Sequence, residues 1–561
     1  MTFIRDIIMT LYKRKWRYYI ALPFLLVGVL ALRQLQNKQH MKLSKNFEIF
    51  ADILKELDDL YVDEIDPDHV VKTGLDAMLY SLDPYTSFLT EEDLENFKTS
   101  TTGEYGGIGA FISKRKEKVM VVTLFKDCPA HKGGLRVGDE ISRVNGESML
   151  DSSITHVSSL LKGMPSTPVQ LSVVRPGVEQ ELELTLTREH VTIKNVPYYG
   201  QIQQQDIGYI RLASFSIQAA EEVQAALESL KASGTQKLIL DLRGNPGGML
   251  EAAIQVANLF VGKDCVVVAT KSKVAALAKT YTTAQHAYDT KMPIIVLIDQ
   301  LSASASEIVA GVIQDYDRGV LIGKNTFGKG LVQTTRPLSY NTQLKLTTSK
   351  YYLPSGRSIQ KINHGRQSTR NAIVQATDTA AEVFTTQAGR QVYDGNGIAP
   401  DIEKDALSLS PITTSLITAG LIFDYATVFQ VQNHHIVAAQ DFVLSATQYS
   451  DFLAWLKDKE YFYAIESSID QLLKQAQEEL YTVDIMQQIA LLKSQIQYHK
   501  EEDLHKFEEE IKLVLQQEII ARYYFQEGTI EAMLGHDQSI QEACSLFRDM
   551  RQYHDLLKDA A

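Results

Sequence analysis

A run of apolar, mostly β-branched side chains at residues 293–299, PIIVLID, constrains the fold more than any other segment. Such a run is typical of a strand that is buried on both faces of a parallel sheet. Residues 237–242 and 319–323 have the same character, and residues 249–260 and 307–313 carry apolar positions at helical spacing between these runs. Buried strands that alternate with helices predict an α/β core.

Ser304 and Lys329 stand 25 residues apart, each on a loop that follows one of these strands. Ser304 lies in the segment SASASE just before a predicted helix, where free backbone N–H groups and the helix dipole favour an oxyanion. Lys329 lies in the segment GKGLVQ, beyond the strand at 319–323. Because α/β folds carry their sites on loops at strand ends, the pair predicts a serine nucleophile with a lysine base.

A lysine can accept a proton only when its amine is neutral. Its unperturbed pKa of about 10.4 must therefore fall by roughly three near pH 7, which costs about 4 kcal/mol of ammonium stabilisation. Burial against Phe327, Leu331 and Val332 would supply the desolvation, and no carboxylate lies within ten residues of Lys329 in the sequence. Gln333 is expected to orient the amine without changing its charge.

Two other interpretations of these segments remain open. Ser302, Ser304 and Ser306 are also typical of residues that cap a helix. Residues 323–330, GKNTFGKG, fit the phosphate-loop pattern up to the last position, where Gly330 replaces the Ser or Thr that would bind magnesium. A strand-like segment then follows instead of a helix, so a nucleotide site is disfavoured.

The ordered motifs of the chain resemble the C-terminal processing peptidases, or tail-specific proteases, which are Ser-Lys peptidases with a PDZ domain. The resemblance extends over residues 47–401 and rests on LDPYTSFL at 82–89, YGGIG at 105–109, DLRGNPGG at 241–248, SASASE, GKGLVQ, and YYLPSGR at 351–357. It implies that Ser304 is the nucleophile, Lys329 the base and Gln333 the residue that orients it. It also implies an accessory acid at Asp315, for which an exposed helix carboxylate is the alternative.

The turn NPGG at residues 245–248 is expected between the strand at 237–242 and the helix at 249–260. Its glycines allow a close approach of the backbone to a ligand. Together with the resemblance, this predicts an oxyanion hole formed by the backbone N–H groups of Gly247, Gly248 and Ala305. From the local sequence alone, a plain turn explains the glycines equally well.

Residues 101–188 form a β-rich module with turn signals between its strands. The strands are expected at 109–112, 119–124, 140–144, 169–174 and 181–187. The pattern matches a PDZ domain, which adds a peptide to a sheet edge and binds the terminal carboxylate with backbone N–H groups. That site is expected at Tyr105, Gly106, Gly107, Ile108 and Gly109, and the resemblance implies protein or peptide substrates with apolar C-terminal tails. A glycine-rich bulge without a ligand is the alternative.

The N-terminus carries a membrane signal. The basic cluster KRKWR at residues 13–17 precedes the uncharged residues 18–32, which are fewer than the roughly twenty that a membrane span needs and include Pro23. We expect an uncleaved single-pass anchor, with a cleaved signal peptide and a buried helix as alternatives. The basic segment 1–17 is then cytoplasmic and the catalytic domain is periplasmic or otherwise extracytoplasmic, at the inner (cytoplasmic) membrane.

Helical regions are expected on both sides of the peptidase core at residues 189–403. Residues 43–100 carry apolar positions at helical spacing, and the resemblance implies that this region can pair subunits into a homo-oligomer. A plain amphipathic core helix is the alternative. Residues 404–561 are rich in helix signals, with two apolar series separated by the charged residues 500–503. The fold expected overall is an α/β core of crotonase or Clp-protease type, built from βα repeats, with an inserted PDZ domain and helical regions at both ends.

The charge and the cysteine content of the chain exclude further classes of function. A net charge of −13 without a basic stripe argues against a nucleic-acid partner. Three scattered cysteines are too few for a disulfide framework or a thiolate metal site, and no cofactor or metal is expected. The sequence thus predicts an exported serine endopeptidase that recognises the C-terminal tail of its protein substrate. A catalytically idle PDZ scaffold that binds protein C-termini is the alternative.

Overall fold

The structure, a computed structural model, describes residues 41, 44–202, 206–361, 382–405, 408–479 and 483–558. The segments predicted as a cytoplasmic end and a membrane anchor, residues 1–32, lie outside these ranges. The chain forms two compact units, Met1–Phe88 and Leu89–Ala561. Within the described ranges, no single helix has the length and apolar character of a membrane span, although the bent pair Pro411–Thr418 and Leu421–Gln432 meets both criteria jointly.

The first unit is helical over residues 44–60 and in α2 (Pro67–Tyr80). Helix α2 begins at a proline, and the Asp66 carboxylate caps it by accepting hydrogen bonds from the N–H groups of Asp68 and His69. Leu79 is the buried residue of α2, while many large apolar side chains of this unit are exposed. The short strand β1 (Ser87–Leu89) spans the boundary between the two units.

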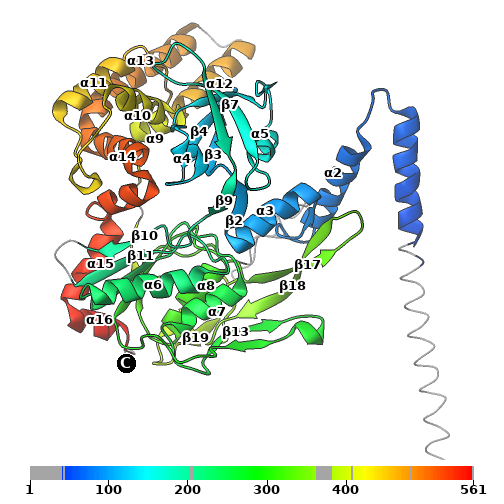
Figure 1. The fold of residues 1–561 in the computed structure, drawn as a ribbon, viewed down its shortest axis with the longest axis vertical. Coiled ribbons are helices and arrows are strands. Elements are labelled where there is room, and N and C mark those ends of the chain that lie inside the picture. Colours follow the sequence, from blue (N-terminus) through cyan, green and yellow to red (C-terminus); the bar gives the residue numbers. More distant parts are fainter. Residues whose placement is uncertain are drawn as a thin grey trace, which may run out of the picture. The chain divides into compact units, whose positions relative to one another are not determined.

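The second unit contains a six-stranded sheet with helices on both faces, called the central sheet below (Figure 1). Its order is β10 (Tyr198–Gln201), β11 (Ile207–Arg211), β12 (Lys237–Asp241), β15 (Ile294–Ile298), β16 (Val320–Gly323) and β21 (Ile402–Glu403). All neighbours pair in parallel except β10 and β11. The structure therefore confirms the three predicted buried strands, and every residue of β15 is buried.

Helices cover both faces of this sheet. On one face, α6 (Ala219–Ala232), α7 (Leu250–Asn258) and α8 (Ala305–Asp315) share a core with Leu240, Ile294 and Val296. On the other face, α15 (Gln538–Arg548) and α16 (Met550–Leu556) pack with Ile239 and Ile295. Because successive side chains of a strand point to opposite faces, one continuous apolar run serves both cores.

A second, antiparallel sheet carries the segment after β16. It contains β13 (Val266–Lys271), β14 (Thr280–Thr282), β17 (Leu331–Pro337) and β18 (Gln343–Tyr352), with the short helix η1 (Ala275–Leu277) between β13 and β14. The hairpin of β19 (Val383–Thr385) and β20 (Gln391–Tyr393) follows. The strand-like segment predicted after Lys329 is thus confirmed as β17.

The β-rich module contains all five predicted strands. They are β3 (Ala110–Arg115), β4 (Lys118–Leu124), β5 (Glu140–Val144), β7 (Pro168–Val174) and β8 (Leu182–Thr187), in the order β3-β4-β5-β7-β8, with β6 (Glu147–Ser148) beside β5. Helices α4 (Pro129–Lys132) and α5 (Ile154–Leu161) contribute to the core of this module, and α3 (Glu91–Thr102) precedes it in the chain. Strand β2 (Glu104–Gly107) pairs with β9 (Glu189–Thr192). Strand β3 lies at the edge of its sheet.

Most of the C-terminal helices form a core of their own. They are α9 (Pro411–Thr418), α10 (Leu421–Gln432), η2 (Ala439–Asp441), α11 (Ala446–Leu456), α13 (Val483–Lys506) and α14 (Glu508–Met533). Helix α12 (Ala464–Glu478) packs with α13 in a second, smaller cluster. Residues 404–561 were predicted as one helical extension. In the structure this stretch is divided, because α15 and α16 pack against the central sheet.

Helix α13 continues to Lys506 through the charged residues 500–503, which separate the two apolar series. Lys500 is buried, and its ammonium forms an ion pair with Glu466 and donates to the Tyr461 carbonyl. The rings of Tyr461, Phe462 and Tyr463 surround it at 5.3–5.4 Å. A charged residue here is part of the packing between α12 and α13, which the sequence alone did not indicate.

Candidate active site

Ser304 lies in the loop between the end of β15 and the start of α8, as predicted. It is the N-cap residue of α8, is half-buried, and has φ 55° and ψ −111°. A positive φ is unfavourable for a residue with a Cβ, and such strain persists only where the surroundings enforce it. Asp299 closes the loop before the serine by accepting hydrogen bonds from the N–H groups of Leu301 and Ser302.

The Glu307 carboxylate connects the serine loop to the lysine loop. Its Oε2 accepts hydrogen bonds from the N–H groups of Ser304 (2.8 Å) and Lys329 (2.9 Å). Its Oε1 accepts from the Thr326 hydroxyl (2.6 Å) and the Gly328 N–H (2.8 Å). The carboxylate is fully buried, and burial raises the pKa of Glu307, although the four accepted hydrogen bonds act in the opposite direction. One side chain thus fixes the backbone on both sides of the predicted dyad.

Tyr351 of β18 makes a second connection between the two loops. Its buried hydroxyl donates to the Lys329 carbonyl at 2.6 Å and lies 3.3 Å from the Ser304 carbonyl. The structure therefore brings the main chains of Ser304 and Lys329 together. Gln333 follows on β17 beside a register shift, and its Nε2 donates to the Thr347 hydroxyl at 3.2 Å.

The glycine turn lies against the start of α8. A Cβ at Gly247, whose φ is 97°, would lie 2.6 Å from the Ala303 carbonyl oxygen and 2.9 Å from the Ala305 nitrogen, so only glycine fits. The Gly247 N–H donates to Oδ1 of Asn245 at 2.9 Å and is already engaged. Within the described part of the chain, the N–H groups of Gly248 and Ala305 donate to no protein acceptor. Of the three predicted oxyanion donors, these two are available.

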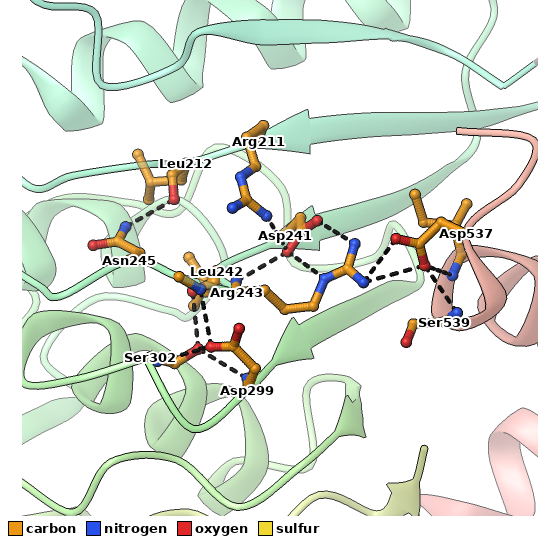
Figure 2. Close-up of polar contacts among 12 residues, drawn as sticks. Arg211, Leu212, Asp241, Leu242, Arg243, Asn245, Asp299, Ser302, Asp537 and Ser539 are labelled. Atoms are coloured by element: carbon orange, nitrogen blue, oxygen red, sulfur yellow. Dashed lines mark hydrogen bonds and ion pairs between the residues drawn. The ribbon is translucent and has the colours of Figure 1, made fainter. Parts of the chain in front are cut away.

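A charged network lies at the end of β12, just before this turn in the chain (Figure 2). Asp241 is fully buried and accepts hydrogen bonds from Arg243 (Nη2, 2.6 Å; Nε, 3.0 Å) and from the Tyr209 hydroxyl (2.7 Å), and it forms an ion pair with Arg211 at 2.9 Å. Burial by itself would raise the pKa of Asp241, but Arg243 and Arg211 hold it well below its usual range. Arg243 also reaches Asp537 of the C-terminal segment.

The two residues that follow Arg243 are held by hydrogen bonds to the segments after β15 and β11. The Gly244 N–H donates to Oδ1 of Asp299 at 2.9 Å, and Nδ2 of Asn245 donates to the Leu212 carbonyl at 2.8 Å. The Asn245 carbonyl accepts from the Ser306 hydroxyl and from the Ala303 N–H. The turn is therefore connected directly to the loop that carries Ser304.

Asp315 does not join this site. It is buried at the last residue of α8, forms an ion pair with Arg357 at 2.8 Å and accepts from the Ser355 N–H. Eleven residues of helix place it about 16 Å along the axis from Ser304. The exposed carboxylate considered as an alternative is therefore wrong, and the side chain is part of a buried ion pair.

Of the predicted peptide-binding residues, Tyr105, Gly106 and Gly107 belong to β2, and Ile108 and Gly109 connect β2 to β3. Gly106 packs so closely on residue 163 that a Cβ would lie 2.1 Å from its carbonyl oxygen, and Gly109 has φ 77°. Ile108 is buried, and its carbonyl accepts from the Ala130 N–H. The β3 strand that follows pairs with β4 on one side only, and Phe111 on it is 51% exposed.

Three segments of the chain match known families. Residues 206–369 match "Peptidase family S41", residues 121–175 match "PDZ domain", and residues 412–547 match "Probable PDZ-protease, C-terminal helical domain". The "Carboxy-terminal-processing protease" of Bartonella bacilliformis is 35% identical over 354 residues, which cover 62% of this chain and 81% of that protein.

Two further relatives are more distant. The "Carboxy-terminal processing protease CtpA" of Bacillus subtilis is 33% identical over 302 residues, which cover 54% of this chain and 64% of that protein, a little under two thirds of its length. Among solved structures, a "photosystem II D1 C-terminal processing protease" is 27% identical and covers 64% of this chain and 92% of its own, with a TM-score of 0.34.

The contacts of Glu307 lead to a prediction for Glu307→Gln. The substituted amide turns an NH2 group toward two of the four donors, and a buried donor without an acceptor costs about 1–3 kcal/mol. We expect a lower free energy of unfolding and a loss of cleavage larger than the unfolded fraction explains, measured by thermal unfolding and peptide hydrolysis. Glu251→Gln, on an exposed position of α7, is the control. Wild-type activity of Glu307→Gln would refute the connecting role.

Proposed function

This chain belongs to the carboxy-terminal-processing proteases of peptidase family S41, and we propose that Ser304 and Lys329 form its catalytic dyad. As a member of that family it is a serine-type endopeptidase with a PDZ domain and a helical C-terminal domain. The observation that carries the proposal is the pair of connections, through Glu307 and Tyr351, between the main chains of Ser304 and Lys329.

The proposed reaction follows from the chemistry of these groups. The Ser304 hydroxyl attacks the scissile carbonyl while the neutral Lys329 amine accepts its proton, and Gln333 orients the amine. The N–H groups of Gly248 and Ala305 stabilise the oxyanion, which is often the largest single contribution to such catalysis. Lys329 then returns the proton to the leaving amine, and water hydrolyses the acyl-enzyme.

We propose that the PDZ domain selects the substrate by its C-terminal tail. The free edge of β3 supports this, because an extended peptide can pair there with its carboxylate toward the loop from Tyr105 to Gly109. The exposed ring of Phe111 adds apolar surface beside that edge. The substrates are thus proteins or peptides with apolar C-terminal tails.

We also propose that the peptidase core is of the crotonase or Clp-protease type. The parallel strands β11, β12, β15 and β16, with α6, α7 and α8 in the connections between them, support this. Such βα repeats place successive strand ends, and therefore the loops of Ser304 and Lys329, on one edge of the sheet.

The dyad is tested with an unfolded substrate protein that ends in an apolar tail. Ser304→Ala, Lys329→Ala and Lys329→Arg should each lower the cleavage rate by about 10²–10⁴-fold, because an arginine in place of the base stays charged. Wild-type cleavage should rise with pH as the Lys329 ammonium loses its proton. Lys324→Ala, which removes the ion pairs of the same loop with the exposed Glu403 and Asp405, should stay active. Equal turnover by all variants would refute the dyad.

The same experiment separates the enzyme from the idle scaffold. A second substrate with an acidic tail should be cleaved more slowly, and its affinity for the Ser304→Ala variant should be lower. Equal cleavage of both substrates would contradict tail recognition, and binding without any cleavage by the wild-type chain would favour the scaffold.

We propose that residues 18–32 anchor the chain as a single pass in the inner (cytoplasmic) membrane, with residues 1–17 in the cytoplasm and the catalytic domain outside it. The basic cluster before an uncharged stretch supports this orientation. The full-length protein should therefore sediment with membranes after a high-salt wash, and an added protease should digest it in spheroplasts. Recovery of the full-length protein in the cytoplasmic fraction would contradict the proposal.

We propose that the first unit pairs two copies of the chain. Leu54 and Leu57 are half-buried, whereas Phe47, Ile53 and Leu60 are 68%, 52% and 74% exposed, an apolar surface that a second copy would cover. Light scattering of the protein without residues 1–40 should give a dimer. Serine at Phe47, Ile53 and Leu60 should give a monomer, and serine at the exposed Glu48 and Lys55 should not. A wild-type monomer would refute pairing.

A further inference from the structure

Asp537 connects the C-terminal segment to the active-site sheet. Its carboxylate caps α15 by accepting hydrogen bonds from the N–H groups of Ser539 (2.9 Å) and Ile540 (3.0 Å). The same carboxylate contacts Nη1 of Arg243 through both oxygens, at 3.1 and 2.8 Å (Figure 2). The two partners are 294 residues apart in the chain.

The packing of α15 decides where this carboxylate lies. Ile540 and Phe547 of α15 are buried in the same core as Ile239 of β12 and Leu297 of β15. The first turn of α15 therefore lies beside the C-terminal end of β12, just before the glycine turn. Asp537 and Arg243 are both only partly exposed, with 27% and 21% of their side-chain surfaces accessible, so water screens their attraction less than at an open surface.

Two carboxylates share the guanidinium of Arg243. Asp241 accepts hydrogen bonds from Nε, Nη2 and the backbone N–H of Arg243, and Asp537 accepts one from Nη1. Arg243 is the residue immediately before Gly244 in the turn that ends with Gly248. The ion pair with Asp537 therefore restrains the beginning of the segment that carries an oxyanion donor at its end.

We propose that Asp537 is a positioning residue for peptide-bond hydrolysis. By holding Arg243, it keeps the Gly248 N–H in place beside the Ala305 N–H, and the C-terminal segment thus takes part in the geometry of the oxyanion hole. Small displacements of preorganised donors lower the rate of the chemical step without weakening the binding of the ground state. The inference rests on the proposed active site.

The test compares Asp537→Asn with Asp537→Glu and Asp549→Asn. An asparagine can still cap α15 but loses the ion pair, while Asp549 caps α16 through the Gln552 N–H and has no cationic partner within the described residues. For Asp537→Asn we expect kcat to fall roughly three- to tenfold with little change in KM. Asp537→Glu should recover part of this loss, and Asp549→Asn should behave as the wild type.

A peptide aldehyde provides the second measurement, since its adduct with Ser304 places an oxygen in the oxyanion position. Its affinity for Asp537→Asn should fall by the same factor as kcat, a change that a purely structural role would not cause. Unchanged kcat, or a lower kcat with unchanged aldehyde affinity, would overturn the inference. Ser304→Ala is measured in parallel: if it still cleaves, the proposed active site fails, and if it is inactive while Asp537→Asn is fully active, only the role of Asp537 fails.

Discussion

The arrangement of the site depends on one buried carboxylate, that of Glu307. Four donors from two loops converge on its two oxygens, and two of them are the N–H groups of Ser304 and Lys329. The serine loop belongs to the parallel sheet and the lysine loop leads into the antiparallel one, so this carboxylate also joins the two sheets. Tyr351 repeats the connection at the carbonyl groups. The backbone conformations of both loops are therefore determined together.

The two buried carboxylates of this region are stabilised in different ways. Asp241 lies beside two guanidinium groups, so the attraction outweighs its burial and its pKa falls. The four groups that donate hydrogen bonds to Glu307 are neutral, so burial dominates and its pKa rises. Asp241 thus supports the glycine turn with charge, whereas Glu307 supports the serine and lysine loops with hydrogen-bond geometry. A buried polar group of either kind is costly once a partner is removed.

The sequence predicted those elements whose signals are local. The apolar runs of β12, β15 and β16 and the alternating strands of the PDZ domain were found because periodicity and turn residues mark them. The glycine turn and the position of Ser304 at the start of a helix followed from the same kind of signal.

Long-range partners left no such signal. The motif that contains Glu307 does not indicate its partners, and the segment around Asp537 has no functional signal. The Gly247 N–H was predicted as an oxyanion donor, but Asn245, two residues away, engages it. Strands β13, β14 and β18 were not predicted. The pairing of β13 with β18 joins distant parts of the chain, whereas β13 with β14 and β17 with β18 are local hairpins. The burial of Lys500 and of Asp315 was not predicted for a related reason, since a charged side chain is buried only where distant residues supply its counter-charge.

Helices α15 and α16 cover one face of β12, β15 and β16, although a ribosome synthesises them long after those strands. The sheet that carries the serine loop therefore keeps an open apolar face until both helices have been synthesised. Its folding on the ribosome finishes only after α15 and α16 have emerged.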